Sequence, residues 1–173
     1  SLFSSTEVSP SQKDMLNTIQ SCGHSLLTIL DDVLDFSKIE SGKIKLENQS
    51  FDIAKCMKEI EFLFSNTARE KGIEYSCEIL PKEEVIAPHF IIGDAIRLKQ
   101  ILINLVSNAV KFTSNGGVYL TMDYEYQSNN SYSLRFSIRD TGIGISQNAQ
   151  KSLFQAFTQA DTSITRRFGG TGL

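Results

Sequence analysis

The sequence has few cysteines, no long apolar run and no strong excess of charge of either sign, and each absence excludes a class of protein. Its three cysteines lie far apart without CxxC spacing, which argues against a disulfide framework or a structural zinc site. No apolar run approaches the roughly 20 residues that a membrane-spanning helix needs, and no signal peptide is visible. The net charge of −3 gives no reason to expect nucleic acid or an anionic membrane as a partner. We therefore expect a cytoplasmic segment that contacts neither.

What the sequence does contain is typical of a folded protein. It has 173 residues, of which 40% are hydrophobic and 21% are charged, so there is room for one ordinary domain and an appended element. The chain does not begin with Met, and it stops directly after a glycine-rich stretch. We expect it to be a fragment of a longer protein.

Residues 1–8 are short and polar and predict a loop or a frayed end, and residues 9–41 predict one long amphipathic helix. Ser9 offers a helix cap, Pro10 suits the first helical position, Gln12 completes a capping box, and Gly42 ends the helix. Apolar residues then recur at alternating spacings of four and three, as in a coiled-coil seam. They are Met15, Ile19, Cys22, Leu26, Ile29, Val33 and Phe36. One helix cannot bury such a seam alone, so we expect it to pack with partner helices in a dimer.

Residues 43–173 predict a second domain with helices layered on a mixed sheet, an α+β fold. The expected elements are a short strand at 44–46, a helix from Ile53 to Gly72, a strand over 73–79, a helix over about 95–112 capped by Asp94, a hairpin pairing 118–126 with 132–138, and a short helix around 151–157. The buried face expected for the 95–112 helix consists of Leu98, Leu102, Leu105, Ala109 and Phe112.

A polar stripe runs along the 95–112 helix. Asn104, Asn108 and Lys111 recur at four and three residues, so they share one face. Amide oxygens are suitable ligands for Mg²⁺, which takes few protein ligands together with phosphate oxygens, and Lys111 can meet a phosphate as a point charge. The alternative is an ordinary solvated helix flank.

Asp140 lies where the last predicted strand ends. Counting by two from Leu134 through Phe136 and Ile138 places its carboxylate on the core side, where burial is costly without a hydrogen-bonding partner. The segment Thr141-Gly142-Ile143-Gly144 follows it, and a carboxylate in a glycine-lined slot can accept from an exocyclic amine such as that of adenine. The alternative is a charge that already lies outside, at the end of the strand.

The last thirty residues combine glycines, arginines and a few apolar anchors. Phe168-Gly169-Gly170-Thr171-Gly172 would let backbone N–H groups approach a phosphate, although most such stretches are only turns. The long polar segment before it carries Phe154 and Phe157 as anchors and the arginines 166 and 167 near its end. A loop of this length is typical of a lid or of a disordered segment.

Taken together, these motifs resemble the N, G1, F and G2 boxes of the sensor histidine kinases, and the long polar segment before the last glycines resembles that of hybrid kinases. The order is Asn-x-x-x-Asn-x-x-Lys, Asp-x-Gly-x-Gly, Phe-x-x-Phe and Gly-x-Gly. The resemblance extends to DDVLDFSKIESGK (31–43), GDAIRLKQILINLVSNAVKFT (93–113) and LFQAFTQADTSITRRFGGTGL (153–173), and so covers nearly the whole chain.

The resemblance implies a Bergerat-type α/β sandwich that binds Mg-ATP, with its C-terminal part missing from this chain. Residues 1–42 would be the second helix of the dimerisation and phosphotransfer hairpin, and residues 43–173 the ATP-binding catalytic domain. The implied roles are adenine binding by Asp140, shaping of the base pocket by Gly142 and Gly144, Mg²⁺ binding by Asn104 and Asn108, phosphate contacts by Lys111 and by Arg166 or Arg167, lid anchoring by Phe154 and Phe157, and approach to the triphosphate by Gly170, Thr171 and Gly172.

The same fold serves gyrase, chaperone and mismatch-repair ATPases, which use a Glu near the position of Asn104. An amide cannot take a proton from water, so Asn104 favours a kinase, whose acceptor imidazole is already nucleophilic near pH 7. The family's acceptor His lies on the first hairpin helix, which this chain lacks, and we interpret His24 as a surface residue instead. The implied partners are a second copy and a response-regulator receiver domain. A non-catalytic scaffold is the alternative.

Overall fold

The computed structural model describes residues 9–80, 89–129 and 131–150, and the chain divides into two compact units. Residues 46–146 form one unit, which contains every described strand. The other contains the N-terminal helix α1 (Pro10–Glu40) and the short helix α4 (Gln147–Gln150). The domain boundary between residues 42 and 43 stays a prediction.

Helix α1 begins and ends as its sequence predicts. The Ser9 side chain accepts from the Gln12 backbone N–H at 3.3 Å, and the Gln12 side chain accepts from the Ser9 N–H at 2.9 Å, which is the expected capping box with Pro10 in the first turn. At the other end Gly42 has a φ of 64°, a conformation that favours glycine. Its N–H and that of Lys43 donate back into the last turn of the helix.

Most of the apolar stripe of α1 that the structure describes is exposed in the single chain. The exposed large apolar side chains of this helix have exposed fractions between 40%, for Val33, and 64%, for Met15. Burial of such a stripe is the main source of stability for an amphipathic helix, so this exposure agrees with the prediction that α1 needs partner helices. Among the residues described, no helix is both long and apolar enough to span a membrane.

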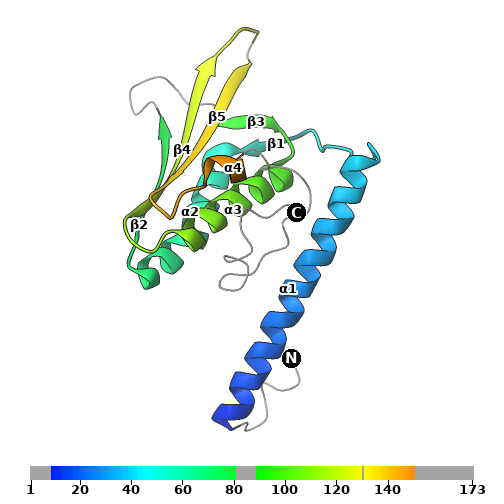
Figure 1. The fold of residues 1–173 in the computed structure, drawn as a ribbon. Coiled ribbons are helices and arrows are strands. Elements are labelled where there is room, and N and C mark those ends of the chain that lie inside the picture. The colour runs from blue at the N-terminus through cyan, green and yellow to red at the C-terminus, as the bar shows by residue number, and fades with distance from the viewer. Residues whose placement is uncertain (1–8, 81–88, 130, 151–173) are drawn as a thin grey trace. The chain divides into compact units, whose positions relative to one another are not determined.

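The larger unit contains two sheets (Figure 1). A three-stranded sheet has the order β2-β4-β5, formed by β2 (Glu74–Leu80), β4 (Gly117–Tyr126) and β5 (Tyr132–Asp140). Strands β2 and β4 are parallel, and β4 and β5 form an antiparallel hairpin. The other sheet is an antiparallel ribbon of β1 (Gln49–Asp52) and β3 (Phe90–Gly93). The predicted mixed sheet and α+β fold are confirmed.

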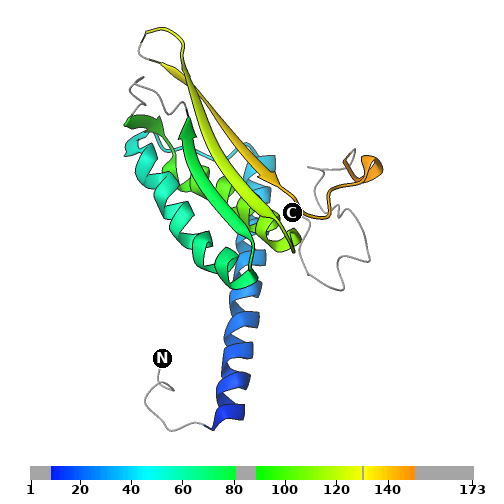
Figure 2. The same ribbon diagram turned by 90° about the vertical axis from the view of Figure 1, so that its left-hand side faces the viewer.

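Helices α2 (Ile53–Lys71) and α3 (Ala95–Phe112) lie side by side on one face of the three-stranded sheet (Figures 1 and 2). Parallel strands require a crossover connection, and α3 lies in the connection from β2 to β4. The buried side chains between helices and sheet form the core. Its fully buried members include Ile53, Met57, Ile60, Leu102, Val106, Val118, Leu120 and Met122. This core fixes α3 against the end of the hairpin.

The start of α3 is the predicted one. Asp94 caps the helix, since its Oδ1 accepts from the Arg97 N–H at 3.0 Å, and its Oδ2 accepts from the Glu47 N–H at 3.2 Å. These hydrogen bonds, the one from Arg97 first, lower the pKa of the Asp94 carboxyl because they stabilise its charged form.

One predicted strand was wrong, and one strand was missed. Residues 44–46 form no strand, and the pairing segment is β1, a few residues later, while β3 was not predicted at all. Each of these two strands is only four residues long, and they pair with each other rather than with the main sheet. A two-stranded ribbon this short forms only when its two strands pair across a long stretch of sequence. The alternation of apolar residues within one strand therefore does not predict it.

The buried face of α3 also differs from the predicted one. Leu105 is 41% exposed, whereas Val106 and Val110 are buried together with Leu102 and Ala109. The helix contacts both α2 and the sheet, so its buried face is set by two neighbours rather than by the leucine pattern alone. Relative to the predicted face, the observed buried face is rotated by about one residue and includes the β-branched Val106 and Val110.

This rotation can be tested with two identical substitutions. Leu102→Ala removes a side chain that is 1% exposed, and we expect it to lower the free energy of unfolding by about 2–5 kcal/mol. Leu105→Ala, three residues later in the same helix, should cost less than about 1 kcal/mol. Urea unfolding measures both, and equal losses would contradict the orientation of α3 described above.

Candidate functional site

The polar stripe predicted on α3 lies on one exposed flank of the helix. Asn104 and Asn108 are exposed and stand one turn apart, and Lys111 is half-buried at the last turn. The Lys111 ammonium lies 5.2 Å from the centre of the Phe112 ring, within the range of a cation–π contact. Two amide oxygens one turn apart on an open helix face can share a hydrated divalent cation, so this pair fits the predicted Mg²⁺ site.

The C-terminal end of α3 is held by residues from three places in the chain. A helix leaves its last four carbonyl groups without partners inside the helix. Thr113, which is fully buried, donates to Ala109 O both from its N–H at 3.1 Å and from its Oγ1 at 2.8 Å. Lys71 Nζ, from the last turn of α2, donates to Val110 O and Lys111 O.

The fourth carbonyl connects α3 to the turn after β5. Phe112 O accepts from the Ile143 N–H at 3.4 Å, and a Cβ placed on Gly142 would lie 2.5 Å from the same oxygen. Position 142 therefore admits only glycine without a backbone shift. The contact brings the segment 140–144 directly against the last turn of the helix that carries Asn108 and Lys111.

Thr141 holds this turn to the loop that precedes β4. Its Oγ1 donates to Asn115 O and accepts from the Gly117 N–H, both at 3.0 Å, and its own N–H donates to Gly117 O at 3.1 Å. The hydroxyl also occupies the space next to Gly116, where a Cβ would lie 2.2 Å from it. Gly116 has a φ of 91°, so glycine is required there for conformation as well as for space.

Asp140 shares the face predicted for it but is not buried. It pairs with Val118 at the end of the β4–β5 ladder, and the next pair on the same face, Leu120 and Ile138, contributes to the core. The residue is nevertheless exposed, because it is the last of its strand and glycines follow within a few residues. Its Oδ1 accepts from the Gly142 N–H at 2.9 Å. The prediction of a buried carboxylate was wrong, and the alternative of a charge outside the strand's end is correct.

The structure brings together only part of the predicted site. Asn108, Lys111, Asp140 and Gly142 belong to two elements that are in contact, and Gly144 follows with a φ of 69°. Asn104 lies one turn before Asn108 on α3. The other predicted residues lie outside the described part of the chain. They are Phe154, Phe157, Arg166, Arg167, Gly170, Thr171 and Gly172.

Three residues that support this site were not predicted to do so. Thr113 and Thr141 adjoin the predicted motifs. A polar residue next to a helix end or a glycine turn often hydrogen-bonds to the nearby backbone, so their positions in the sequence could have indicated this role. Lys71 gives no such signal, since its acceptors lie 39 and 40 residues further along the chain. Only the packing of α2 beside α3 reveals its role.

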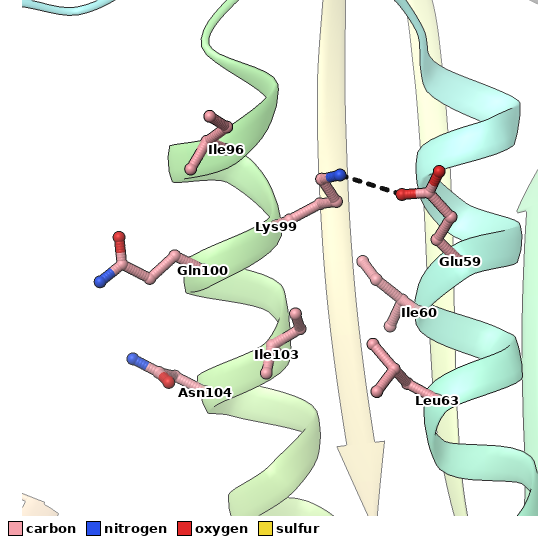
Figure 3. A pocket seen from close by; sticks show the side chains of 8 residues that line it. All are labelled: Glu59, Ile60, Leu63, Ile96, Lys99, Gln100, Ile103 and Asn104. Carbon is pink, nitrogen blue, oxygen red and sulfur yellow. Dashed lines mark hydrogen bonds and ion pairs between the residues drawn. The ribbon is translucent and has the colours of Figure 1, made fainter. Parts of the chain in front are cut away.

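A separate groove of about 480 Å³ lies between α2 and α3 (Figure 3). Four of its eight lining side chains are apolar, namely Ile60, Leu63, Ile96 and Ile103. The Lys99 Nζ and Glu59 Oε2 atoms, 2.9 Å apart, form an ion pair between its two walls. In Figure 3 Asn104 points away from α2, and it is the one residue of the polar stripe among the groove's lining residues. The groove is therefore distinct from the junction between α3 and the turn at 140–144.

Two family matches cover most of the sequence. Residues 93–173 match the family described as "Histidine kinase-, DNA gyrase B-, and HSP90-like ATPase". Residues 1–42 match the "His Kinase A (phospho-acceptor) domain". The first match contains α3 and the turn at 140–144, and the second contains α1.

Individual relatives are similar over nearly the whole chain. It is 47% identical over 168 residues to "Signal transduction histidine-protein kinase BarA" of Escherichia coli, and the match covers 97% of this chain but 18% of that protein. It is 42% identical over 172 residues to "Sensor histidine kinase GacS" of Pseudomonas protegens, with coverage of 99% and 18%. The chain thus spans less than a fifth of either relative.

Solved structures agree with these similarities. A structure described as "ShkA full-length in complex with AMPPNP" matches with a TM-score of 0.71 and 34% identity, covering 97% of this chain and 33% of that one. A complex of "histidine kinase ThkA" with "response regulator protein TrrA" matches with a TM-score of 0.59 and 25% identity, covering 94% and 45%.

The close approach at Gly142 gives a direct test of the junction. Gly142→Ala places a methyl group against Phe112 O, and we expect it to lower the free energy of unfolding by about 1–3 kcal/mol. Gly93→Ala is the matched control, because its Cβ would meet only a Phe51 ring carbon at 3.6 Å and should change stability by less than about 0.5 kcal/mol. Thermal or urea unfolding distinguishes them, and a neutral Gly142→Ala would show that the contact is not formed.

Proposed function

Since this chain belongs to the sensor histidine kinases, we propose that it is the part of such a kinase that binds ATP and delivers the γ-phosphoryl group to a histidine. The acceptor is a His on a dimerisation hairpin, and the phosphoryl group then passes to an Asp of a response regulator. In the first step an imidazole nitrogen forms the new bond to the γ-phosphorus, the bond to the bridging oxygen breaks, and ADP leaves.

The observation that carries this proposal is the contact between the end of α3 and the turn at 140–144. This contact joins the turn that follows the exposed carboxylate of Asp140 to the end of the helix that carries Asn108 and Lys111. The proposed site therefore has a carboxylate on the turn side and amide and ammonium groups on the helix side. A nucleotide has the same division, with an amine on its base and negative charge on its phosphates. Its adenine end fits the carboxylate, and its phosphates fit the amide and ammonium groups.

Each described site residue then has a distinct role. Asp140 accepts from the adenine amine, and its fixed hydrogen bond from Gly142 N holds the carboxylate in place. Gly142 and Gly144 shape the base pocket, and Lys111 binds a phosphate. Asn104 and Asn108 would hold Mg²⁺, which supplies charge neutralisation to the phosphate oxygens when it is bound.

The residues beyond position 150 complete the proposed nucleotide site. Phe154 and Phe157 would anchor a lid, and Arg166 or Arg167 would contact the phosphates. Gly170, Thr171 and Gly172 would let the backbone approach the triphosphate. The AMPPNP named with the ShkA structure, an analogue of ATP, supports a nucleotide as the ligand.

Asn104 favours phosphoryl transfer to a side chain over hydrolysis. A hydrolase needs a base that removes a proton from water, and an amide cannot serve as one. A neutral imidazole needs no such base, so catalysis can rest on positioning and charge neutralisation. The exposed amide of Asn104 fits such a transfer and gives no base for hydrolysis.

The proposed partners follow from the two family matches. The match of residues 1–42 to a phospho-acceptor domain and the exposed stripe of α1 support a homodimer through hairpin helices. The ThkA–TrrA complex supports a response regulator as the second partner. We place this segment of the kinase in the cytoplasm, where ATP is available.

Substitution of Asp140 tests the adenine contact. Asp140→Asn keeps the shape but offers an uncharged side chain to the amine, and we expect ATP affinity to fall roughly ten- to a hundredfold in the full-length protein. Asp123→Asn is the control, since Asp123 is an exposed aspartate of the same sheet, on β4. Calorimetry measures both affinities. Unchanged ATP binding by Asp140→Asn would contradict the assignment of this carboxylate.

Transfer of label tests the reaction itself. The full-length protein is incubated with ATP radiolabelled on its γ-phosphate, and we expect acid-labile, base-stable label on a histidine, lost in Asn108→Ala. Asn104→Glu should gain phosphate release, because it supplies the missing base. ATP binding without label would favour a regulatory module. If Asn104→Glu does not increase the rate of phosphate release, the role given to Asn104 is contradicted.

A further inference from the structure

Lys71 makes a polar contact with a distant part of the chain, next to the proposed nucleotide site. It is the last residue of α2, and Gly72 ends that helix with a φ of 72°. Its ammonium reaches across to α3 and donates to Val110 O at 2.6 Å and to Lys111 O at 2.9 Å. These are two of the carbonyls that α3 cannot pair within itself.

The contact is not explained by the needs of α2 alone. A lysine in the last turn of a helix commonly interacts with the carbonyls of its own helix. In the last turn of α2 the carbonyls of Ala68 and Arg69 accept from the backbone N–H of Gly72, and the side chain of Lys71 donates to two carbonyls of the neighbouring helix. It therefore serves the end of α3.

A second lysine joins the same two helices elsewhere and provides a comparison. Lys99 Nζ and Glu59 Oε2 lie 2.9 Å apart near the beginnings of α3 and α2 (Figure 3). Both lysines therefore connect α2 to α3, one at each end of the pair. Only Lys71 contacts the turn that carries the side chain of Lys111.

The positive charge of Lys71 also changes the electrostatic environment that a bound phosphate would meet. The C-terminal end of a helix carries partial negative charge on its carbonyls, which would repel the phosphates of a nucleotide. The ammonium of Lys71 offsets this charge at two carbonyls and fixes the backbone from which Lys111 extends. Val110, whose carbonyl it binds, is buried, so the contact is partly protected from solvent.

We propose that Lys71 is a positioning residue of the nucleotide site, which holds and neutralises the last turn of α3 so that Lys111 and Asn108 can bind phosphate. This inference rests on the proposed function. Lys71 does not itself touch ATP in this account, so its removal acts on the affinity for ATP more than on the rate of transfer.

The test compares Lys71→Met, Lys71→Arg and the control Lys99→Met in the full-length protein. We expect Lys71→Met to raise the Kd and the KM for ATP about three- to tenfold, with kcat for histidine phosphorylation changed less than about twofold. Lys71→Arg, which keeps the charge and the donors, should restore most of the affinity. Lys99→Met removes the other connection between the helices, an exposed ion pair, and should leave the affinity for ATP unchanged.

The outcomes separate this inference from the proposed function. An ATP affinity of Lys71→Met equal to that of the unaltered protein would overturn the role of Lys71, as would an equal loss of affinity in Lys99→Met. Absence of ATP binding by the unaltered protein would overturn the proposed function and this inference with it. If Lys71→Met does not fold, Lys71→Gln provides the same comparison, because it keeps hydrogen-bond donors but removes the charge.

Discussion

The arrangement of the proposed site depends on how the last four carbonyl groups of α3 find hydrogen-bond donors. A helix cannot satisfy these groups itself, and leaving them buried without partners is costly. Here Thr113, Lys71 and Ile143 supply the donors. The end of one helix therefore fixes the neighbouring helix and the turn after β5. Asn108, Lys111 and Asp140 come together as a result of this backbone requirement.

The chemistry proposed for the site places few demands on individual side chains. Phosphoryl transfer to a neutral imidazole needs positioning and charge neutralisation rather than a strong base. In the described part of the chain, the proposal uses an exposed carboxylate with one hydrogen bond from the backbone, two amides on an open helix face and one lysine. The glycine at 142 matters as much as these polar groups, because any side chain there would separate the turn from Phe112 O.

The sequence predicted the features that local patterns encode and missed those that depend on contacts distant along the chain. The capping residues Ser9 and Asp94, the bounds of α3 and the β4–β5 hairpin are local, and they are confirmed. The ribbon of β1 and β3, the exposure of Leu105 and the role of Lys71 depend on packing, and no pattern within a single element indicates them. Asp140 shows the same division, since alternation gave its face correctly but not its exposure at the strand's end.

Hydrogen exchange of the full-length protein with and without Mg-AMPPNP tests the central claim most directly. If the end of α3 and the turn after β5 form one nucleotide site, the ligand should slow amide exchange both in residues 109–113 and in residues 140–144, at the same ligand concentration. Slower exchange in only one of these segments, or in neither while the nucleotide is bound, would contradict the account.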